Sequence, residues 1–279
     1  PNDANVLYLP AGRKFYRQTE LGSIALTGQW DSISQGWTRF PDTLLKINDT
    51  NADHVFSAIA VSTKNPANRV YLGTSRNKLF RIDDANTGTP AFKALNLPLA
   101  NTIAYVSCIA VDPDNADRVL VAYSNYNIYS LFLSENAGQN WQKVGGNLEA
   151  TVGGNGGPLS IRWVSMLPFP NGKRKYFCGT SIGLYSADSL SLHATGKPGT
   201  QWTLESPDGI GSAVVSYIET RASDGLVVAA THGNGIFTAN FNTVGAYELA
   251  EAVRVQVSPN PAREVAEFQV LGKNAEGAT

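Results

Sequence analysis

Hydrophobic and polar positions alternate along most of the chain in short runs, and five of these runs share one pattern. Each has an apolar run, small residues, a polar turn and a second apolar or aromatic run. The five segments are VLYLPAGRKFYR (6–17), VYLGTSRNKLFR (70–81), VLVAYSNYNIYS (119–130), YFCGTSIGLYSA (176–187) and VVAATHGNGIFT (227–238). Alternation around a turn rich in Gly and Asn predicts a β-hairpin in each segment.

The hairpins belong to a longer repeat. Successive hairpins are 63, 49, 57 and 51 residues apart when one position is aligned in each, namely Leu9, Leu72, Val121, Cys178 and Ala229. Another alternating run precedes three hairpins (56–61, 106–111 and 164–169), and short segments that begin at Trp141 and Trp202 follow two of them. Four short antiparallel strands in each repeat of about 50–60 residues predict an all-β chain of propeller blades. A linear β-solenoid is the alternative, but its repeats are usually shorter.

One further signature lies between the third and fourth strands of the repeat. The segment SENAGQNW (134–141) resembles the Asp-box of sialidase-type (BNR) and sortilin-like propellers, S-x-D-x-G-x-x-W, with Asn136 in place of the aspartate. SADS followed by GTQW, which ends at Trp202, resembles the same box with an insertion. The resemblance covers residues 1–241 and implies a structural role: the polar residue caps a turn while the tryptophan packs between blades. The residues concerned are Ser134, Asn136, Gly138 and Trp141.

The start of the chain predicts an incomplete blade. Because PNDANVLYL aligns with NPANRVYL, residue 1 is expected in the loop between the second and third strands of a blade, which would then lack its first two strands. Such a blade would expose unpaired strand edges. The sequence therefore predicts that the rest of the propeller, on the same polypeptide or on another chain, is a partner of these blades.

The last part of the chain has a different pattern. Residues 242–252 are predicted to be a linker, and residues 253–279 begin a small Ig-like β-sandwich. In VRVQVSPNPAREVAEFQV (253–270), two alternating runs flank a turn that contains two prolines. This resembles the opening of the C-terminal sorting domain of the bacterial type IX secretion system, with Pro259, Asn260 and Pro261 as the motif. An unrelated Ig-like module is the alternative. The resemblance implies export across the outer membrane, to the cell surface or the medium, with the secretion machinery as a partner.

Composition restricts the classes of function. Lys plus Arg number 22 against 23 Asp plus Glu, so no excess of positive charge favours nucleic acid or anionic membrane. No run of 18 apolar residues predicts a membrane span. Cys108 and Cys178 are 70 residues apart and outside any CxxC pattern, so buried thiols in strands are expected, with a disulfide as the alternative. No segment has the spacing of a metal or cofactor site, and none is predicted.

His232 is the most conspicuous candidate for chemistry, because it lies between small residues in THGNGIF (231–237). The aligned position holds Ser75, Ser124 and Ser181 in other hairpins, which favours a turn residue over a ligand contact or a catalytic base. Gly233 and Gly235 suit such a turn. If there is a site, we expect it on the face formed by the hairpin turns and the connections between blades. The candidate ligand-binding residues there are Arg76, Tyr126, Arg162, His232 and Asn234.

No catalytic constellation is visible in the sequence. We therefore expect a secreted or cell-surface propeller that acts as a non-enzymatic scaffold or binding module for a glycan or a surface protein. The alternative is a glycoside hydrolase of the Asp-box type, which needs two facing carboxylates. Asp31, Asp188 and Asp208 lie in predicted loops, but their spacing in the sequence does not place any two together.

Overall fold

The computed structural model describes residues 2–24, 36–40, 54–100, 103–149, 157, 159–192 and 199–241, and the backbone of 254–258 and 267–271. Within these ranges the regular structure is strand, with two short 3-10 turns, η1 (Leu21–Ser23) and η3 (Gly146–Leu148). This confirms the all-β prediction. No helix in the described part is long and apolar enough to cross a membrane.

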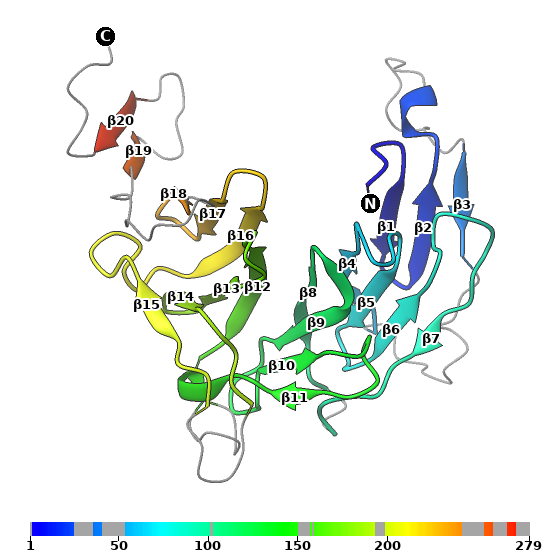
Figure 1. Cartoon of the computed structure of the whole chain (residues 1–279), viewed down its shortest axis with the longest axis horizontal. Coiled ribbons are helices and arrows are strands. Elements are labelled where there is room, and N and C mark those ends of the chain that lie inside the picture. The colour runs from blue at the N-terminus through cyan, green and yellow to red at the C-terminus, as the bar shows by residue number, and fades with distance from the viewer. Residues whose placement is uncertain are drawn as a thin grey trace. The chain divides into compact units, whose positions relative to one another are not determined.

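Three sheets each contain four antiparallel strands in chain order, as the repeat predicts (Figure 1). The first is β4 (Phe56–Val61), β5 (Val70–Thr74), β6 (Leu79–Ile82) and β7 (Lys93–Ala94). The second is β8 (Val106–Asp112), β9 (Asn115–Tyr123), β10 (Leu131–Ser134) and β11 (Gln142–Lys143). The third is β12 (Ile161–Pro168), β13 (Arg174–Thr180), β14 (Gly183–Ala187) and β15 (Thr203–Glu205).

The remaining sheets are smaller. One contains β1 (Leu7–Ala11), β2 (Lys14–Gln18) and β3 (Trp37–Arg39), and another contains β16 (Val215–Arg221), β17 (Leu226–Thr231) and β18 (Ile236–Asn240). The two strands predicted around the Ser-Pro-Asn-Pro stretch are present as a two-stranded sheet, β19 (Arg254–Ser258) and β20 (Glu267–Leu271).

The first sheet corrects the prediction for the start of the chain. The β1–β2 hairpin corresponds to β5–β6, the second and third strands of a blade, and β3 corresponds to the fourth strand. Three strands are therefore present where two were predicted, and residue 1 precedes the second strand of the blade. The error arose because the hairpin was counted as the last two strands of a blade, whereas in the repeat it forms the second and third.

The strand register places the aligned positions of the repeat in equivalent surroundings. In four sheets the aligned apolar residue lies directly opposite an aromatic residue of the next strand. These pairs are Leu9–Tyr16, Leu72–Phe80, Cys178–Tyr185 and Ala229–Phe237. The sequence alignment of the hairpins is therefore also a structural alignment.

The chain forms two compact units, and the division between them passes through the β8–β11 sheet. In the first unit, a core built around Phe15, Leu72 and Phe80 joins the β1–β3 sheet to the β4–β7 sheet. In the second unit, a core built around Phe177 and Val215 joins the β12–β15 sheet to the β16–β18 sheet. Both cysteines are buried thiols, as predicted.

An aromatic residue stands at or just before the start of each outer strand. These residues are Trp37, Phe92, Trp141 and Trp202, next to β3, β7, β11 and β15. The indole Nε1 of Trp141 donates to the Asn96 carbonyl at 2.8 Å, and that of Trp202 donates to the Val144 carbonyl at 3.2 Å. Both carbonyls lie just after the outer strand of the preceding sheet. The tryptophan therefore ties β11 and β15 each to the sheet before it.

Gly146, which follows β11 and lies against Thr200 just before β15, allows a stability test of the contact between these two sheets. It lies in η3 with φ +53°, and a Cβ atom there would lie 1.8 Å from the Thr200 carbonyl oxygen. We expect Gly146→Ala to lower the free energy of unfolding by more than about 3 kcal/mol, because left-handed strain adds to a clash with backbone. Gly172 has φ +78° and open space around it, so Gly172→Ala is a matched control that should cost only about 1 kcal/mol. Equal midpoints of the two variants in urea unfolding would contradict this expectation.

Candidate functional site

His232 is an exposed residue of the β17–β18 turn. Its backbone N–H donates to the Val214 carbonyl at 2.8 Å, just before β16. Gly233 and Gly235, on either side of Asn234, have φ values of +85° and +83°. Thr231 closes the turn, because its N–H and its Oγ1 both donate to the Gly235 carbonyl, at 3.0 and 2.6 Å.

The same anchor occurs in other sheets. The N–H of Ser75 donates to the Val55 carbonyl and that of Ser181 to the Ser160 carbonyl, each at 2.9 Å. In every case the acceptor immediately precedes the first strand of the same sheet. The preceding threonines, Thr74, Thr180 and Thr231, all use their hydroxyls within the turn. The aligned position is thus held by its backbone, and Ser75 and Ser181 also accept the Val55 and Ser160 N–H groups through their hydroxyls. A threonine precedes the position in these three turns, whereas Tyr123 precedes Ser124.

The other candidate residues lie at several places. Arg76 follows the β5 strand in the first unit, whereas Tyr126, Arg162, His232 and Asn234 belong to the second unit. Tyr126 is 53% exposed in the β9–β10 connection. Arg162 is exposed on β12.

The segment 134–141 forms a compact hydrogen-bonded turn. Ser134 Oγ donates to Asn136 Oδ1 at 3.1 Å and accepts the Gly138 N–H at 2.8 Å. Asn136 Oδ1 also accepts the Asn140 N–H at 2.9 Å. Gly138 has φ +82°, and the Trp141 indole reaches Asn96 as described above. All four residues are therefore engaged in the turn or in the contact with the preceding sheet.

Arg162 lies at an irregularity that the sequence did not indicate. The register of β12 against β13 shifts between Ile161 and Trp163, so Arg162 is the extra residue of a β-bulge. Equivalent shifts occur between Phe56 and Ala58 in β4 and between Val215 and Tyr217 in β16. A bulge redirects the side chains next to it and is frequent near functional sites.

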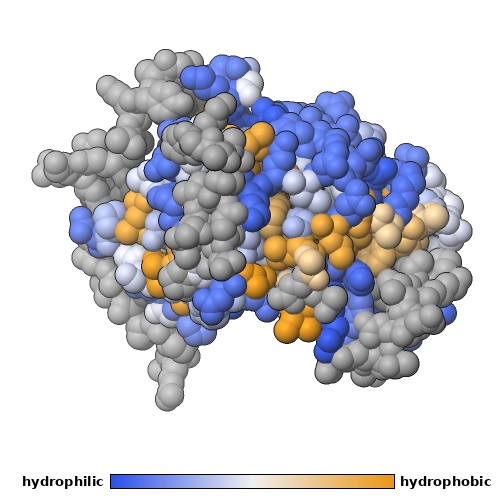
Figure 2. Space-filling view, turned by 90° about the horizontal axis from the view of Figure 1, so that it is seen from below, coloured by the Kyte–Doolittle hydropathy of each residue, from blue (hydrophilic) through white to orange (hydrophobic). Residues whose placement is uncertain are grey.

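The residue after the bulge differs between the sheets. In the aligned strands FSAIAV, VSCIAV, IRWVSM and VSYIET, this residue is Ala58, Cys108, Trp163 and Tyr217 in turn. Ala58 and Cys108 are buried, whereas Tyr217 is 43% exposed and Trp163 is half-buried. Figure 2 shows hydrophobic residues among hydrophilic ones on one face of the molecule. The repeat alone therefore does not account for two large aromatic residues at this position.

Trp163 and Tyr217 contact each other across the two sheets of the second unit. Their ring centroids are 4.4 Å apart and their planes are inclined by 43°. Tyr217 Oη donates to Glu219 Oε2 at 2.7 Å, and both residues are exposed. The Thr220 hydroxyl donates to the Met166 carbonyl at 3.0 Å, which fixes β16 against β12. Strands β12 and β16 thus hold an aromatic surface with the Glu219 carboxylate beside it. Arg162 precedes Trp163 in the chain.

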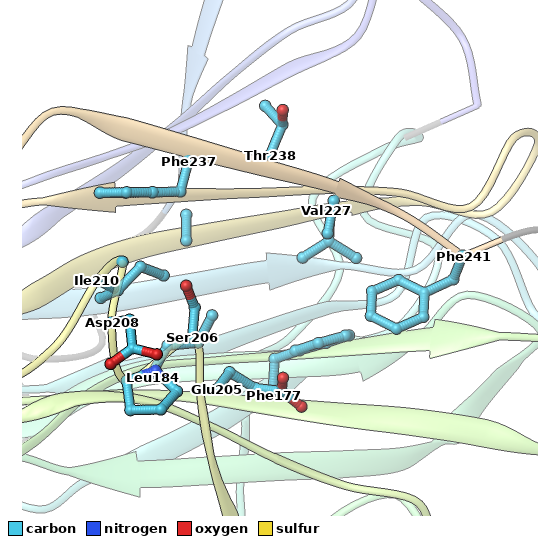
Figure 3. A pocket seen from close by; sticks show the side chains of 14 residues that line it. Phe177, Leu184, Glu205, Ser206, Asp208, Ile210, Val227, Phe237, Thr238 and Phe241 are labelled. Carbon is cyan, nitrogen blue, oxygen red and sulfur yellow. The ribbon is translucent and has the colours of Figure 1, made fainter. Parts of the chain in front are cut away.

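A pocket of about 330 Å³ lies elsewhere in the second unit, between β13–β15 and β17–β18 (Figure 3). Its lining includes the apolar side chains of Phe177, Leu184, Ile210, Val227, Phe237 and Phe241. Two carboxylates, Glu205 and Asp208, also line it. Glu205 is held by a short hydrogen bond from Ser186 Oγ, and Lys175 Nζ lies 3.9 Å from it. Lys175 also pairs with Asp188 at 2.9 Å.

The described part contains no group of three or more His, Cys, Asp or Glu residues that is placed to hold a metal ion. Pro259, Asn260 and Pro261 of the sorting motif lie outside the described residues, as does the predicted linker 242–252.

Glu149 is a buried carboxylate in the second unit. It accepts the Ser130 N–H at 2.7 Å and the Gly157 N–H at 3.0 Å, and so joins the β9–β10 hairpin to the glycine-rich connection before β12. Burial raises the pKa of Glu149, against the lowering effect of the two N–H donors and Lys143. The protonated form is therefore relatively favoured in the fold.

This burial predicts a pH dependence of stability. The pKa of Glu149 is higher in the folded state than in the unfolded state. Its contribution to the free energy of unfolding is therefore fully present below about pH 4.3 and is lost as pH rises through the folded-state pKa. The glutamine side chain of the Glu149→Gln variant cannot ionise. We expect the free energy of unfolding of the wild type, minus that of the variant, to fall as pH rises from 4 to 7. Urea unfolding at several pH values measures this difference, and a constant or rising difference would contradict the assignment.

No model of a protein family matches the chain, and no curated protein matches it in sequence. The chain is similar to solved structures, among them two with a TM-score above 0.5. The extracellular domain of the one-component system BT4673 from B. thetaiotaomicron has a TM-score of 0.52 at 19% identity, and the match covers 86% of this chain and 26% of that one. The GH74 enzyme of Niastella koreensis has a TM-score of 0.55 at 14% identity, covering 87% of this chain and 36% of that one.

This chain thus spans about a quarter and about a third of the length of these two proteins. At such low identities the likeness shows the fold alone. Both proteins are β-propellers, and the fold of this chain is that of β-propeller blades.

Proposed function

We propose that these blades form a non-enzymatic binding module that recognises a glycan through Trp163 and Tyr217. The observation that carries this proposal is the departure from the repeat after the bulge, where Ala58 and Cys108 of other sheets are replaced by two contacting aromatic rings. Trp163 packs partly against the core of the second unit, and Tyr217, which is 43% exposed, extends the aromatic pair to the surface.

The chemistry of the pair suits a pyranose ring. The faces of Trp and Tyr pack against the apolar C–H faces of a sugar, and their polar edges stay in water. The Glu219 carboxylate can accept hydrogen bonds from sugar hydroxyls, and the Arg162 guanidinium can donate to ring and hydroxyl oxygens. A few polar groups beside an aromatic surface are the usual composition of a small-ligand site.

The proposal includes a location outside the cell. The segment Pro259-Asn260-Pro261 resembles a type IX sorting domain, and one similar structure is an extracellular domain. A module at the cell surface or in the medium would meet polysaccharides and surface proteins. Its partners would include the secretion machinery and the rest of the propeller.

A glycoside hydrolase is the second candidate. It is favoured by the two carboxylates, Glu205 and Asp208, which line one pocket, and by the likeness to a GH74 enzyme. Two acids that flank a bound sugar are the usual requirement for this reaction. Glu205, however, is engaged by Ser186 and lies near Lys175, as in a structural ion-pair group.

The test of the binding proposal is Tyr217→Ala. We expect at least a tenfold loss of affinity for a glycan identified on a glycan array, about 1.4 kcal/mol, because one aromatic face is removed. Tyr105→Ala is the matched control, since Tyr105 is also an exposed tyrosine, 41% against 43% for Tyr217, and belongs to the first unit. Isothermal titration calorimetry gives both affinities. Tyr217→Phe should retain most of the affinity, because the ring remains.

Two results would contradict the binding proposal. The first is equal affinity of wild type and Tyr217→Ala for every glycan that binds. The second is turnover of a polysaccharide that disappears in Glu205→Gln or Asp208→Asn, which would establish the hydrolase instead.

The export proposal has a separate test. Deleting residues 253–279 from the protein as expressed in its own host should leave it in the periplasm, because the segment that resembles the sorting domain is removed. Immunoblots of the medium, the cell surface and the periplasm measure the distribution. Replacing residues 253–279 by a Gly-Ser segment of equal length is the control of chain length, and it should give the same distribution as the deletion. Unchanged secretion after the first deletion would contradict the proposal.

A further inference from the structure

Gly179 of β13 lies next to the two strands that carry the aromatic pair. In the register of β12 against β13 it is opposite Trp163. A Cβ atom at this position would lie 2.8 Å from the Val215 carbonyl oxygen and 2.9 Å from Val215 Cγ1. Val215 is the first residue of β16 and precedes Tyr217 by two residues. The missing side chain of Gly179 therefore allows the start of β16 to lie close against β13.

Space, and not backbone conformation, accounts for the glycine at this position. The φ of Gly179 is not in the positive range that favours glycine. A Cβ atom, however, would overlap the Val215 carbonyl oxygen, and a backbone atom cannot rotate away as the end of a long side chain can. We therefore expect an added methyl group to push the start of β16 away from β13.

The first unit contains the same arrangement with small residues in place of the aromatic ones. Gly73 of β5 is opposite Ala58, and a Cβ atom there would lie 2.4 Å from Val106 Cγ1. Val106 is the first residue of β8, as Val215 is of β16, and Cys108 follows two residues later. The glycine and the valine are thus common to both places, whereas the residues beside them differ.

A third sheet has a methyl group at the aligned position. Ala122 of β9 is aligned with Gly73 and Gly179 in the hairpin repeat, and it is fully buried. A blade of this kind can therefore fold with alanine there when the neighbouring strands are placed for it. For this reason we expect Gly179→Ala to shift β16 and not to prevent folding.

The strand β16 is also fixed farther along its length. The Thr220 hydroxyl lies 3.0 Å from Ser165 Oγ and donates to the Met166 carbonyl at 3.0 Å. Tyr217 lies between this point and Val215. A shift of Val215 away from β13 would therefore tilt β16 about Thr220 and move the Tyr217 ring with it.

We propose that Gly179 is a positioning residue of the aromatic site. By letting Val215 lie against β13, it holds the Tyr217 ring where its centroid is 4.4 Å from that of Trp163. A ligand that rests on both rings needs this separation, because binding sites depend on side chains held to within a fraction of an ångström. The inference rests on the proposed function for its ligand, but the geometry of the rings can be tested without any glycan.

The first test measures the ring pair directly. The near-ultraviolet circular dichroism of the full 279-residue chain, minus that of its Tyr217→Ala variant, gives the signal of Tyr217 in contact with Trp163. Gly179→Ala should lose most of this signal, because the rings move apart. Gly73→Ala is the matched control and should retain it, since this change disturbs the contact with Val106 in the first unit. Urea unfolding should show a lowered midpoint for both variants, so reduced stability alone does not account for a difference between them.

The second test measures binding. For a glycan that binds the wild type, isothermal titration calorimetry should give a loss of affinity of about fivefold or more in Gly179→Ala, and no loss in Gly73→Ala. Gly179 has no side chain with which to hold a glycan, so the loss reports the position of Tyr217. If no glycan binds the wild type, the proposed function fails, and the dichroism alone decides the role of Gly179.

Three outcomes would overturn the proposal. The first is a full wild-type dichroism signal in folded Gly179→Ala. The second is an equal loss of that signal in Gly179→Ala and Gly73→Ala. The third is equal glycan affinity of Gly179→Ala and the wild type. If Gly179→Ala does not fold, its combination with Val215→Ala takes its place, because this removes the Cγ1 contact and keeps the carbonyl contact. That double variant should have a weaker signal than Val215→Ala alone, and an equal signal would overturn the proposal in the same way.

Discussion

The contact of an aromatic residue with the preceding sheet is the interaction on which the arrangement of these blades depends. A four-stranded sheet with an outer strand of two or three residues has little hydrogen bonding to hold that strand in place. The Trp202 indole, 3% exposed, supplies both buried apolar area and a directed hydrogen bond. Because the acceptors belong to the sheets before, β11 and β15 are each stabilised by a neighbouring sheet as well as by their own blade.

The repeat made much of the fold predictable. Hairpins at fixed intervals could be recognised because Gly, Asn and alternating apolar residues determine turns and strand faces locally. The three-strand first sheet was not predicted correctly, since a strand as short as Trp37–Arg39 has no periodicity of its own to detect. Its place is determined by pairing with β2, which is tertiary information.

The candidate site was less accessible to sequence reasoning. Arg162 was recognised as a candidate, but Trp163, Tyr217 and Glu219 were not, because large aromatic residues in a strand normally indicate core. Aligning the first strands of the repeat would have singled them out, since small residues stand at the same position in β4 and β8. The bulge before these residues depends on strand register, which residue types do not specify here. Similarly, Glu205 and Asp208 come together at one pocket only because β14 and β15 pair.

The turn that contains His232 has a consequence for how such a surface can diverge. Ser75, Ser181 and His232 are held through their main-chain N–H groups, and the threonines before them close the turns. The hydroxyls of Ser75 and Ser181 also accept the N–H groups of Val55 and Ser160, so each serine closes a reciprocal pair of hydrogen bonds. At position 232 an exposed imidazole replaces that hydroxyl while the main-chain anchor is kept. The last hairpin has thus exchanged a stabilising side-chain contact for a group that faces solvent, which is one way in which a repeat can acquire a new ligand.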